Sequence, residues 1–206
     1  MNVGVLVSGE GTNLQALLDA EARGELAPAA ISVVVSNVPT ARALARAQAA
    51  GKPAIAIDHR GQSREAFEDL VLAALDGVEL VVLAGFMRVL TPHFLARFPM
   101  RVINTHPSLL PQFPGKDAPA QALAAGATTS GVTVHFVEAI VDAGPIIAQA
   151  RVPVEAGDDA ARLHARIQRE EHVMLPRIVQ QIAAGKIRVQ DGRVSIDDVA
   201  TSGGAE

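Results

Sequence analysis

The chain has 206 residues, of which 49% are apolar, and a formal net charge of −4. This length predicts one large domain, or one domain with an appendage, that buries a substantial core. The acidic balance argues against a broad nucleic-acid-binding surface. The absence of cysteine excludes a disulfide framework and a thiolate metal site. With no apolar run of membrane-spanning length and no signal sequence, we expect a soluble cytoplasmic protein.

Short apolar runs alternate with Ala-rich helical stretches through the first half of the chain. Strands are predicted at 3–7, 31–36, 54–57, 80–83 and 100–103. Helices are predicted at 13–23, 41–50 and 64–75, followed by a short helix that Thr91 caps and Pro92 opens. Because the strands are apolar on both faces, helices must cover both faces. The predicted fold class is α/β, a doubly wound and mostly parallel sheet with helices on both faces.

The pattern changes after Pro111. A helix at 117–125 precedes two longer strands at 131–137 and 146–152, joined through the turn Asp142-Ala143-Gly144-Pro145. A long helix at 158–184 stops at Gly185, and 188–196 predicts a terminal hairpin turning at Asp191-Gly192. Residues 197–206 are small and polar, which predicts a flexible tail.

Asn104 and His106 follow the apolar run 100–103, which predicts that they lie just past the end of a strand. Residues two apart on an extended chain point the same way, so both should face a pocket at the carboxyl edge of the sheet. Both can donate hydrogen bonds to an oxyanion. A carboxylate from Asp142 over the same strand ends would favour the imidazolium and provide a proton relay. No serine or cysteine nucleophile is evident, so the attacking group should belong to a substrate; the alternative is a purely structural loop.

The first strand ends in Ser8-Gly9-Glu10-Gly11-Thr12-Asn13 and leads into a helix. Glycines that expose backbone N–H groups, next to the positive end of a helix, predict a phosphate cradle, with a structural turn as the alternative. The spacing fits neither the dinucleotide fingerprint nor a nucleoside-triphosphate loop, so a phosphomonoester is the better hypothesis.

Three further polar residues need an explanation. Glu171 falls in the apolar stripe of the last long helix, where an acid must be paired or must face a ligand cavity unless the stripe's edge reaches solvent. Arg64 starts a helix, where a solvated arginine is the plainer interpretation. His135 lies on a predicted strand face with Thr133 and Val137, where it is either a core histidine or a supporting one.

These motifs together resemble the folate-dependent formyltransferases, and within them the glycinamide ribonucleotide formyltransferases of purine synthesis. The resemblance covers nearly the whole chain. It is carried by Ser8-Gly9-Glu10-Gly11-Thr12-Asn13-Leu14-Gln15, Ala84-Gly85-Phe86-Met87-Arg88-Val89-Leu90, Asn104-Thr105-His106-Pro107-Ser108-Leu109-Leu110-Pro111, Val134-His135-Phe136-Val137, Asp142-Ala143-Gly144-Pro145-Ile146-Ile147 and Glu171-His172.

The resemblance implies a Rossmann-like fold and formyl transfer from the co-substrate 10-formyltetrahydrofolate to the amine of glycinamide ribonucleotide, without a metal. Asn104 and His106 would hold the oxyanion, and Asp142 would pair with His106 and move the amine's proton through water. Gly11, Thr12 and Asn13 would bind the phosphate, and Glu171 the ribose or amine end. The folate contacts that the resemblance implies are Arg64, Met87, Arg88, Val89, Leu90, Asn104, Ala139, Ile140, Val141 and Asp142.

The resemblance also implies a single formyltransferase domain at 1–196, with a phosphate-binding half at about 1–100 and a folate and catalytic half at about 101–196. Partners would be small-molecule substrates, with no nucleic acid or membrane, and the protein would be a monomer or homodimer. The bond between Leu110 and Pro111 is a candidate for the cis form.

Two departures from the family stand out. Thr105 replaces the usual isoleucine between Asn104 and His106, and its side chain should point away from the pocket. Gly115-Lys116-Asp117-Ala118-Pro119 replaces a segment that often carries histidine near the phosphate, with Lys116 as a possible substitute.

Three alternatives stay open. Methionyl-tRNA formyltransferase and formyltetrahydrofolate deformylase share the Asn-x-His core but usually carry an additional domain. A non-catalytic phosphate-binding module would explain the first loop but not Asn104, His106 and Asp142 together.

Overall fold

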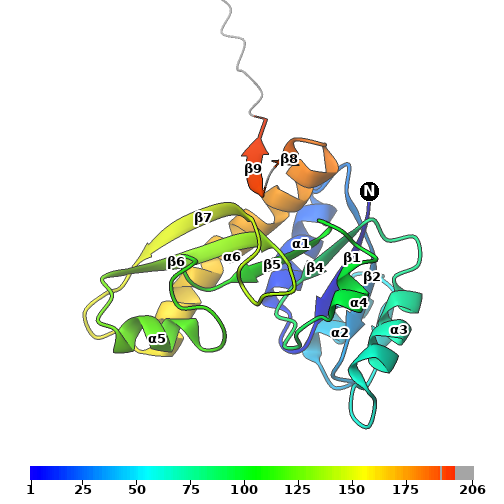
Figure 1. Ribbon diagram of the computed structural model, residues 1–206, viewed down its shortest axis with the longest axis horizontal. Helices are drawn as coiled ribbons and strands as arrows, with labels where there is room; N and C mark the ends of the chain where they lie inside the picture. The colour runs from blue at the N-terminus through cyan, green and yellow to red at the C-terminus, as the bar shows by residue number, and fades with distance from the viewer. Residues whose placement is uncertain (191, 198–206) are drawn as a thin grey trace, which may run out of the picture.

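A seven-stranded sheet in the order β3-β2-β1-β4-β5-β6-β7 forms the centre of the computed structural model, which describes residues 1–190 and 192–197. Its strands are β1 (Asn2–Val7), β2 (Ala30–Ser36), β3 (Ala54–Ala56), β4 (Leu80–Leu83), β5 (Val102–His106), β6 (Thr129–Phe136) and β7 (Ile146–Pro153). The helices are α1 (Thr12–Ala22), α2 (Arg42–Ala49), α3 (Arg64–Ala74), α4 (Pro92–Leu95), α5 (Ala118–Ala124) and α6 (Ala160–Ala183). A separate two-stranded hairpin, β8 (Ile187–Gln190) and β9 (Arg193–Ile196), follows α6 (Figure 1).

The sheet changes direction after β5. Strands β1 to β5 pair in parallel, whereas β6 runs antiparallel to β5 and β7 antiparallel to β6. This confirms the predicted α/β, mostly parallel sheet. The register of the antiparallel pair places Asn104 opposite His135 and His106 opposite Thr133. Side chains from the segments around 104–106 and 133–135 therefore become cross-strand neighbours.

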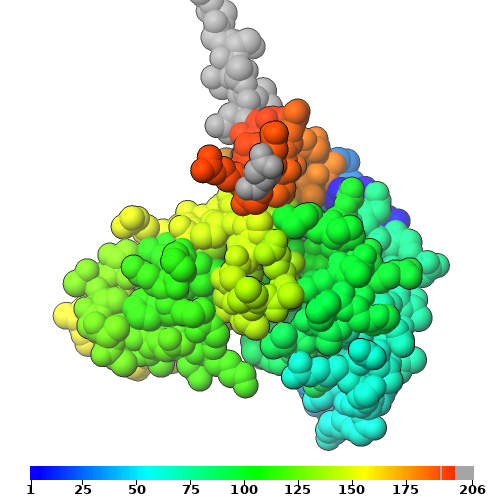
Figure 2. All heavy atoms as spheres, viewed as in Figure 1, coloured from blue at the N-terminus to red at the C-terminus, as the bar shows by residue number. Residues whose placement is uncertain are grey.

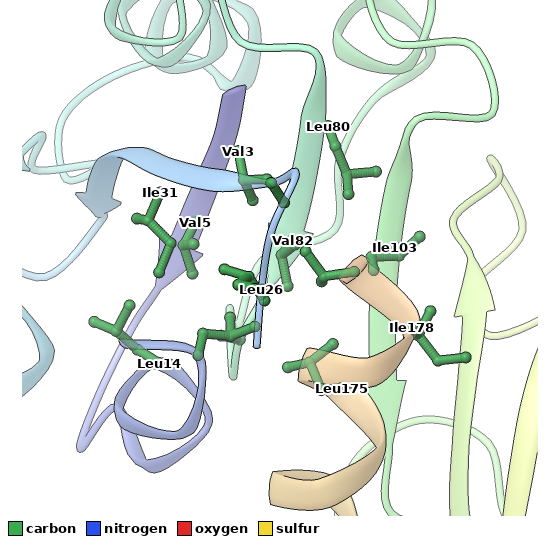
Figure 3. Packing of buried hydrophobic residues seen from close by; sticks show 14 of the residues in the cluster. Val3, Val5, Leu14, Leu26, Ile31, Leu80, Val82, Ile103, Leu175 and Ile178 are labelled. Atoms are coloured by element: carbon green, nitrogen blue, oxygen red, sulfur yellow. The ribbon is translucent and has the colours of Figure 1, made fainter. Parts of the chain in front are cut away.

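Helices cover both faces, and each face has its own apolar core. On one face, Leu14 of α1 and Leu175 and Ile178 of α6 pack on Val5 and Val82 of the sheet (Figure 3). On the other, Phe67 of α3 and Phe94 of α4 lie in a cluster with sheet residues that alternate with the first set. Burying each of these side chains completely contributes about 1.5–3 kcal/mol, so the two cores hold the sheet rigid beneath its carboxyl edge.

The predicted elements are all present in the described residues, with two informative differences. The strand predicted at 100–103 extends through His106, so the prediction that Asn104 and His106 lie past its end is wrong. Hydrogen bonding to β6 continues the strand where the apolar pattern stops. Thr91 precedes α4 but makes no capping hydrogen bond, because its hydroxyl bonds to the buried Glu68.

Several smaller expectations concern particular positions. The Leu110–Pro111 bond is cis, as predicted, and so is Ala27–Pro28. Asp191, at the predicted hairpin turn, and residues 198–206 of the predicted tail lie outside the described residues. In the described part of the chain, no helix combines the length and apolar character required to cross a bilayer.

Candidate active site

A cavity of about 900 Å³ opens at the carboxyl ends of the central parallel strands. Its walls come from 8–13 after β1, from 83–90 at the end of β4 and beyond it, and from 104–107 at the end of β5. Parts of 115–120 and 135–142 and one face of α6 complete them. In Figure 2 the yellow-green segment that joins β6 to β7 lies between the α5 end of the molecule and the end formed by α3. The cavity therefore collects residues from most of the chain at the sheet edge where open α/β folds bind ligands.

Asp142 lies between two buried histidines. Its carboxylate is 3.3 Å from His106 Nδ1 and 3.6 Å from His135 Nε2. The Asn104 amide nitrogen lies 3.3 Å from the same His135 nitrogen. Since the side chains of both histidines and of Asp142 are at most 8% exposed, water screens these contacts weakly. The structure thus brings together Asn104, His106 and Asp142, as the sequence predicts, and adds His135 to them.

The turn that carries Asp142 requires a glycine at its third position. A Cβ on Gly144 would lie 2.0 Å from the Phe136 carbonyl oxygen, closer than any side chain can come. The Phe136 N–H also donates to the Pro145 carbonyl at 2.9 Å. This close approach holds the turn against the end of β6. Asp142 consequently reaches the β5 and β6 histidines, with its own backbone in the left-handed region at φ 55°.

The electrostatics favour an ionised Asp142. Burial raises the pKa of this carboxyl, but hydrogen bonds from His135 and the Gly115 N–H, together with the charges of the two histidines, outweigh burial and lower it below its ordinary value. His106 has an oxygen acceptor at each ring nitrogen, Asp142 at Nδ1 and the Phe113 carbonyl at 2.8 Å from Nε2.

The first loop forms one end of the cavity. Gly11 precedes α1 with φ 74°, and a Cβ there would lie 2.6 Å from the Ala43 Cβ, so only glycine fits. Gly11, Thr12 and Asn13 all line the cavity. The first N–H groups of a helix have no partner within the helix, so those of α1 can donate to an anion.

The Asn13 side chain forms hydrogen bonds within the protein, whereas the phosphate hypothesis suggests that Asn13 contacts a ligand. Its amide nitrogen donates to Glu171 Oε2 at 3.0 Å and to Thr105 Oγ1 at 3.3 Å. Glu171 is 3% exposed and lines the cavity, so the anomalous acid in the helical stripe is paired and does not reach solvent at the stripe's edge. Thr105 itself lines the cavity and accepts the hydrogen bond from Asn13, so the expectation that its side chain points away from the pocket is wrong.

The predicted folate residues divide into two groups. Seven of them line the cavity: Met87, Arg88, Val89, Leu90, Asn104, Val141 and Asp142. Arg64, Ala139 and Ile140 do not, and Arg64 is exposed at the first position of α3. The Met87 N–H donates to Ser8 Oγ at 2.8 Å, so this backbone donor is already used within the protein.

Four other residues also line the cavity. Ser8 and Lys116 come from segments that the sequence relates to the phosphate, whereas His164 and Gln168 have no role assigned from the sequence. A signal for two of them was present, because 164, 168 and 171 follow helical spacing and share one face of α6. Among residues 1–190 and 192–197, no cluster of three His, Cys, Asp or Glu side chains has a geometry that could hold a metal ion.

This fold and this set of groups define a class: an α/β protein in which an amide, two imidazoles and a carboxylate converge in a cavity that also contains the N-terminus of α1. The family model described as formyl transferase matches residues 1–179. The chain therefore belongs to the formyl transferase family.

Relatives and solved structures agree with the family. The chain is 40% identical to phosphoribosylglycinamide formyltransferase of Escherichia coli K12, over 96% of this chain and 94% of that protein. It is 42% identical to the human trifunctional purine biosynthetic protein adenosine-3, over 93% of this chain but only 19% of that protein. The crystal structure of glycinamide ribonucleotide transformylase 1 from Symbiobacterium toebii superposes with a TM-score of 0.94 at 46% identity, covering 96% of this chain and 94% of that one.

Proposed function

We propose that this chain transfers the formyl group of 10-formyltetrahydrofolate to the amine of glycinamide ribonucleotide, giving formylglycinamide ribonucleotide and tetrahydrofolate in purine synthesis. The observation that carries the proposal is the placement of Asn104, His106 and Asp142 in the same cavity as the N-terminus of α1 and Glu171. One cavity thus offers groups for an oxyanion, a proton, a phosphate and a polyhydroxylated substrate.

In the proposed reaction the amine nitrogen of the substrate attacks the formyl carbon. A C–N bond forms, the carbonyl oxygen becomes an oxyanion, and the bond to N10 of the folate then breaks. The Asn104 amide, whose Nδ2 lies 3.3 Å from His135 Nε2, would donate a hydrogen to the oxyanion. His106 would donate a hydrogen bond to this oxygen from Nε2, by exchanging its contact with the Phe113 carbonyl for the substrate.

Asp142 is the proton acceptor in this proposal. The carboxylate is ionised at neutral pH and would take the proton that the amine loses as the tetrahedral intermediate forms; its lowered pKa favours releasing that proton again. A water molecule would connect the two, and the proton would then pass to the departing N10. His135, bonded to the Phe136 carbonyl through Nδ1 at 2.8 Å, holds Asp142 in position.

The two substrates would occupy opposite ends of the cavity. Backbone N–H groups of Gly11, Thr12 and Asn13 would bind the phosphate, and Glu171 would accept hydrogen bonds from the ribose or amine end. The folate would lie along Met87 to Leu90 and the loop from Ala139 to Asp142. Arg64 is outside the cavity lining, so any contact with the acidic tail of the folate would be at the surface.

The broader organisation follows the same proposal. A single domain at 1–196 would bind the phosphate mainly through its first half, about 1–100, and carry the catalytic groups in its second, about 101–196. We infer small-molecule partners, a cytoplasmic location and a monomer or homodimer. Size-exclusion chromatography with light scattering distinguishes the last two states.

The test is a spectrophotometric assay in which the chain is mixed with a 10-formyl folate in the presence and absence of glycinamide ribonucleotide. The proposal predicts an absorbance change that requires the amine substrate. A change of equal rate without the amine would instead indicate folate deformylation, and no change at all with either mixture would contradict an enzymatic function.

A further inference from the structure

Thr105 belongs to a buried polar cluster that joins three elements. It lies in β5 between Asn104 and His106, is 9% exposed, and accepts a hydrogen bond from Asn13 Nδ2. The same nitrogen donates to Glu171 Oε2. Asn13, in the first turn of α1, therefore connects the strand that carries the catalytic groups to the acid on α6.

The orientation of the Asn13 amide is determined by its partners. A primary amide has two N–H donors, and Glu171 and Thr105 use both. Its Oδ1 is buried and has no hydrogen-bond partner in the described part of the chain. Leaving an acceptor unsatisfied is unfavourable, and flipping the amide would turn Oδ1 against the carboxylate of Glu171. The hydrogen bonds to Glu171 and Thr105 thus fix the orientation of the Asn13 amide.

We propose that Thr105 is a positioning residue for the amine substrate. Its hydroxyl fixes the second hydrogen of the Asn13 amide, and the amide in turn fixes Glu171 by engaging Oε2. The other carboxylate oxygen, Oε1, is then already oriented toward the hydroxyl or amine donors of the substrate before the substrate binds. The isoleucine expected at this position from the family resemblance could not accept this hydrogen bond. The inference rests on the proposed function and adds a specificity determinant to it.

The chemistry explains why orientation matters here. A ribose and an amine offer several donors, and a carboxylate recognises them only when its oxygens point correctly. Fixing a carboxylate before binding removes the cost of ordering it when the substrate arrives. Thr105 should therefore affect affinity for the amine substrate, and it should leave the folate end of the cavity and the chemical step unchanged.

The test compares Thr105→Val with Thr105→Ser. Valine keeps the shape and the β-branched strand preference but removes the acceptor, whereas serine keeps the hydroxyl. We expect Thr105→Val to raise the KM for glycinamide ribonucleotide, and its Kd by calorimetry, by about 3- to 10-fold. The folate KM and kcat should stay unchanged, and Thr105→Ser should restore most of the affinity. Thr128→Val, at an exposed position before β6, is the matched control.

A double-mutant cycle makes the test specific. If Thr105 acts through Asn13, adding Thr105→Val to Asn13→Ala should raise the KM for the amine substrate no further. Equal affinity of wild type and Thr105→Val would overturn the inference, as would a parallel loss of kcat and of both affinities, which indicates damage to β5. If the wild type itself transfers no formyl group, the proposed function fails first, and this inference fails with it.

Discussion

Replacing Asp142 with asparagine should abolish most catalysis while preserving the fold. The backbone of Asp142 is left-handed, with φ 55°, and asparagine tolerates this conformation better than other residues that carry a side chain. The asparagine oxygen can still accept the hydrogen bond from the Gly115 N–H, which is 2.8 Å long in the wild type. The substitution therefore removes the negative charge and little else.

The expected loss can be worked from the distances. At the 3.3 Å that separates Asp142 from His106, opposite unit charges attract by about 5 kcal/mol with an effective dielectric constant of about 20. Removing a general base typically costs about 100- to 10,000-fold in rate, which is about 2.7–5.5 kcal/mol. The value for the ion pair falls within the range for the loss of a general base. We therefore predict that kcat falls by about 1000-fold in Asp142→Asn, within that range.

The assay is formyl transfer followed by absorbance at saturating concentrations of both substrates, with unfolding measured in parallel. Asp69→Asn is a matched control, because Asp69 also pairs with a histidine, His93, at 2.7 Å but on the exposed surface. This control should retain wild-type kcat. If Asp142→Asn turns over at a rate close to wild type while remaining folded, the carboxylate does not take the proton and the reasoning is refuted.

Three other predictions concern the loops and the pH dependence. Gly11→Ala should lower the free energy of unfolding by about 2 kcal/mol or more, because alanine is strained in the left-handed conformation and its Cβ would overlap Ala43. The control Gly24→Ala has φ 76° but open space around it, so it should lose only the part that comes from backbone strain. Equal losses of the two variants in denaturant titration would contradict the overlap. Gly144→Ala should displace the turn from Phe136 and reduce kcat, and normal turnover in this variant would show that the contact is dispensable. Because the folded-state pKa of Asp142 lies below its unfolded value, the ionised group stabilises the fold above the unfolded pKa, and this contribution is lost as the pH falls through the folded pKa. The stability of the wild type relative to Asp142→Asn should therefore decrease from about pH 5 to about pH 3, and a constant difference would oppose this.

The order and type of the elements could be predicted because each carries its own local signal. Apolar runs such as 80–83 coincide with the observed strand β4, and Gly185 with φ 70° follows the last long helix as expected. The convergence of Asn104 and His106 was also predictable, since strand alternation alone puts them on one face. Glu171 was recognised because an acid interrupted an apolar stripe.

The remaining features depend on contacts between distant segments. The extension of β5 through His106 and the inclusion of His135 both follow from antiparallel pairing with β6, whose register no local pattern specifies. The engagement of the Asn13 amide by Glu171 joins residues 158 positions apart. The close approach of Gly144 to Phe136 arises only when the turn folds back onto β6. The sequence alone does not distinguish Gly144 from an ordinary turn glycine.

The most direct test supplies 10-formyltetrahydrofolate with an isotope-labelled formyl carbon to the wild-type protein, together with glycinamide ribonucleotide, and identifies the labelled product by mass spectrometry. If the three groups from β5 and the Asp142 turn direct an amine onto the carbonyl, the label appears on the ribonucleotide, one equivalent for each tetrahydrofolate formed. Label found in free formate would mean that water attacks in place of the amine, and the account of the cavity would be wrong.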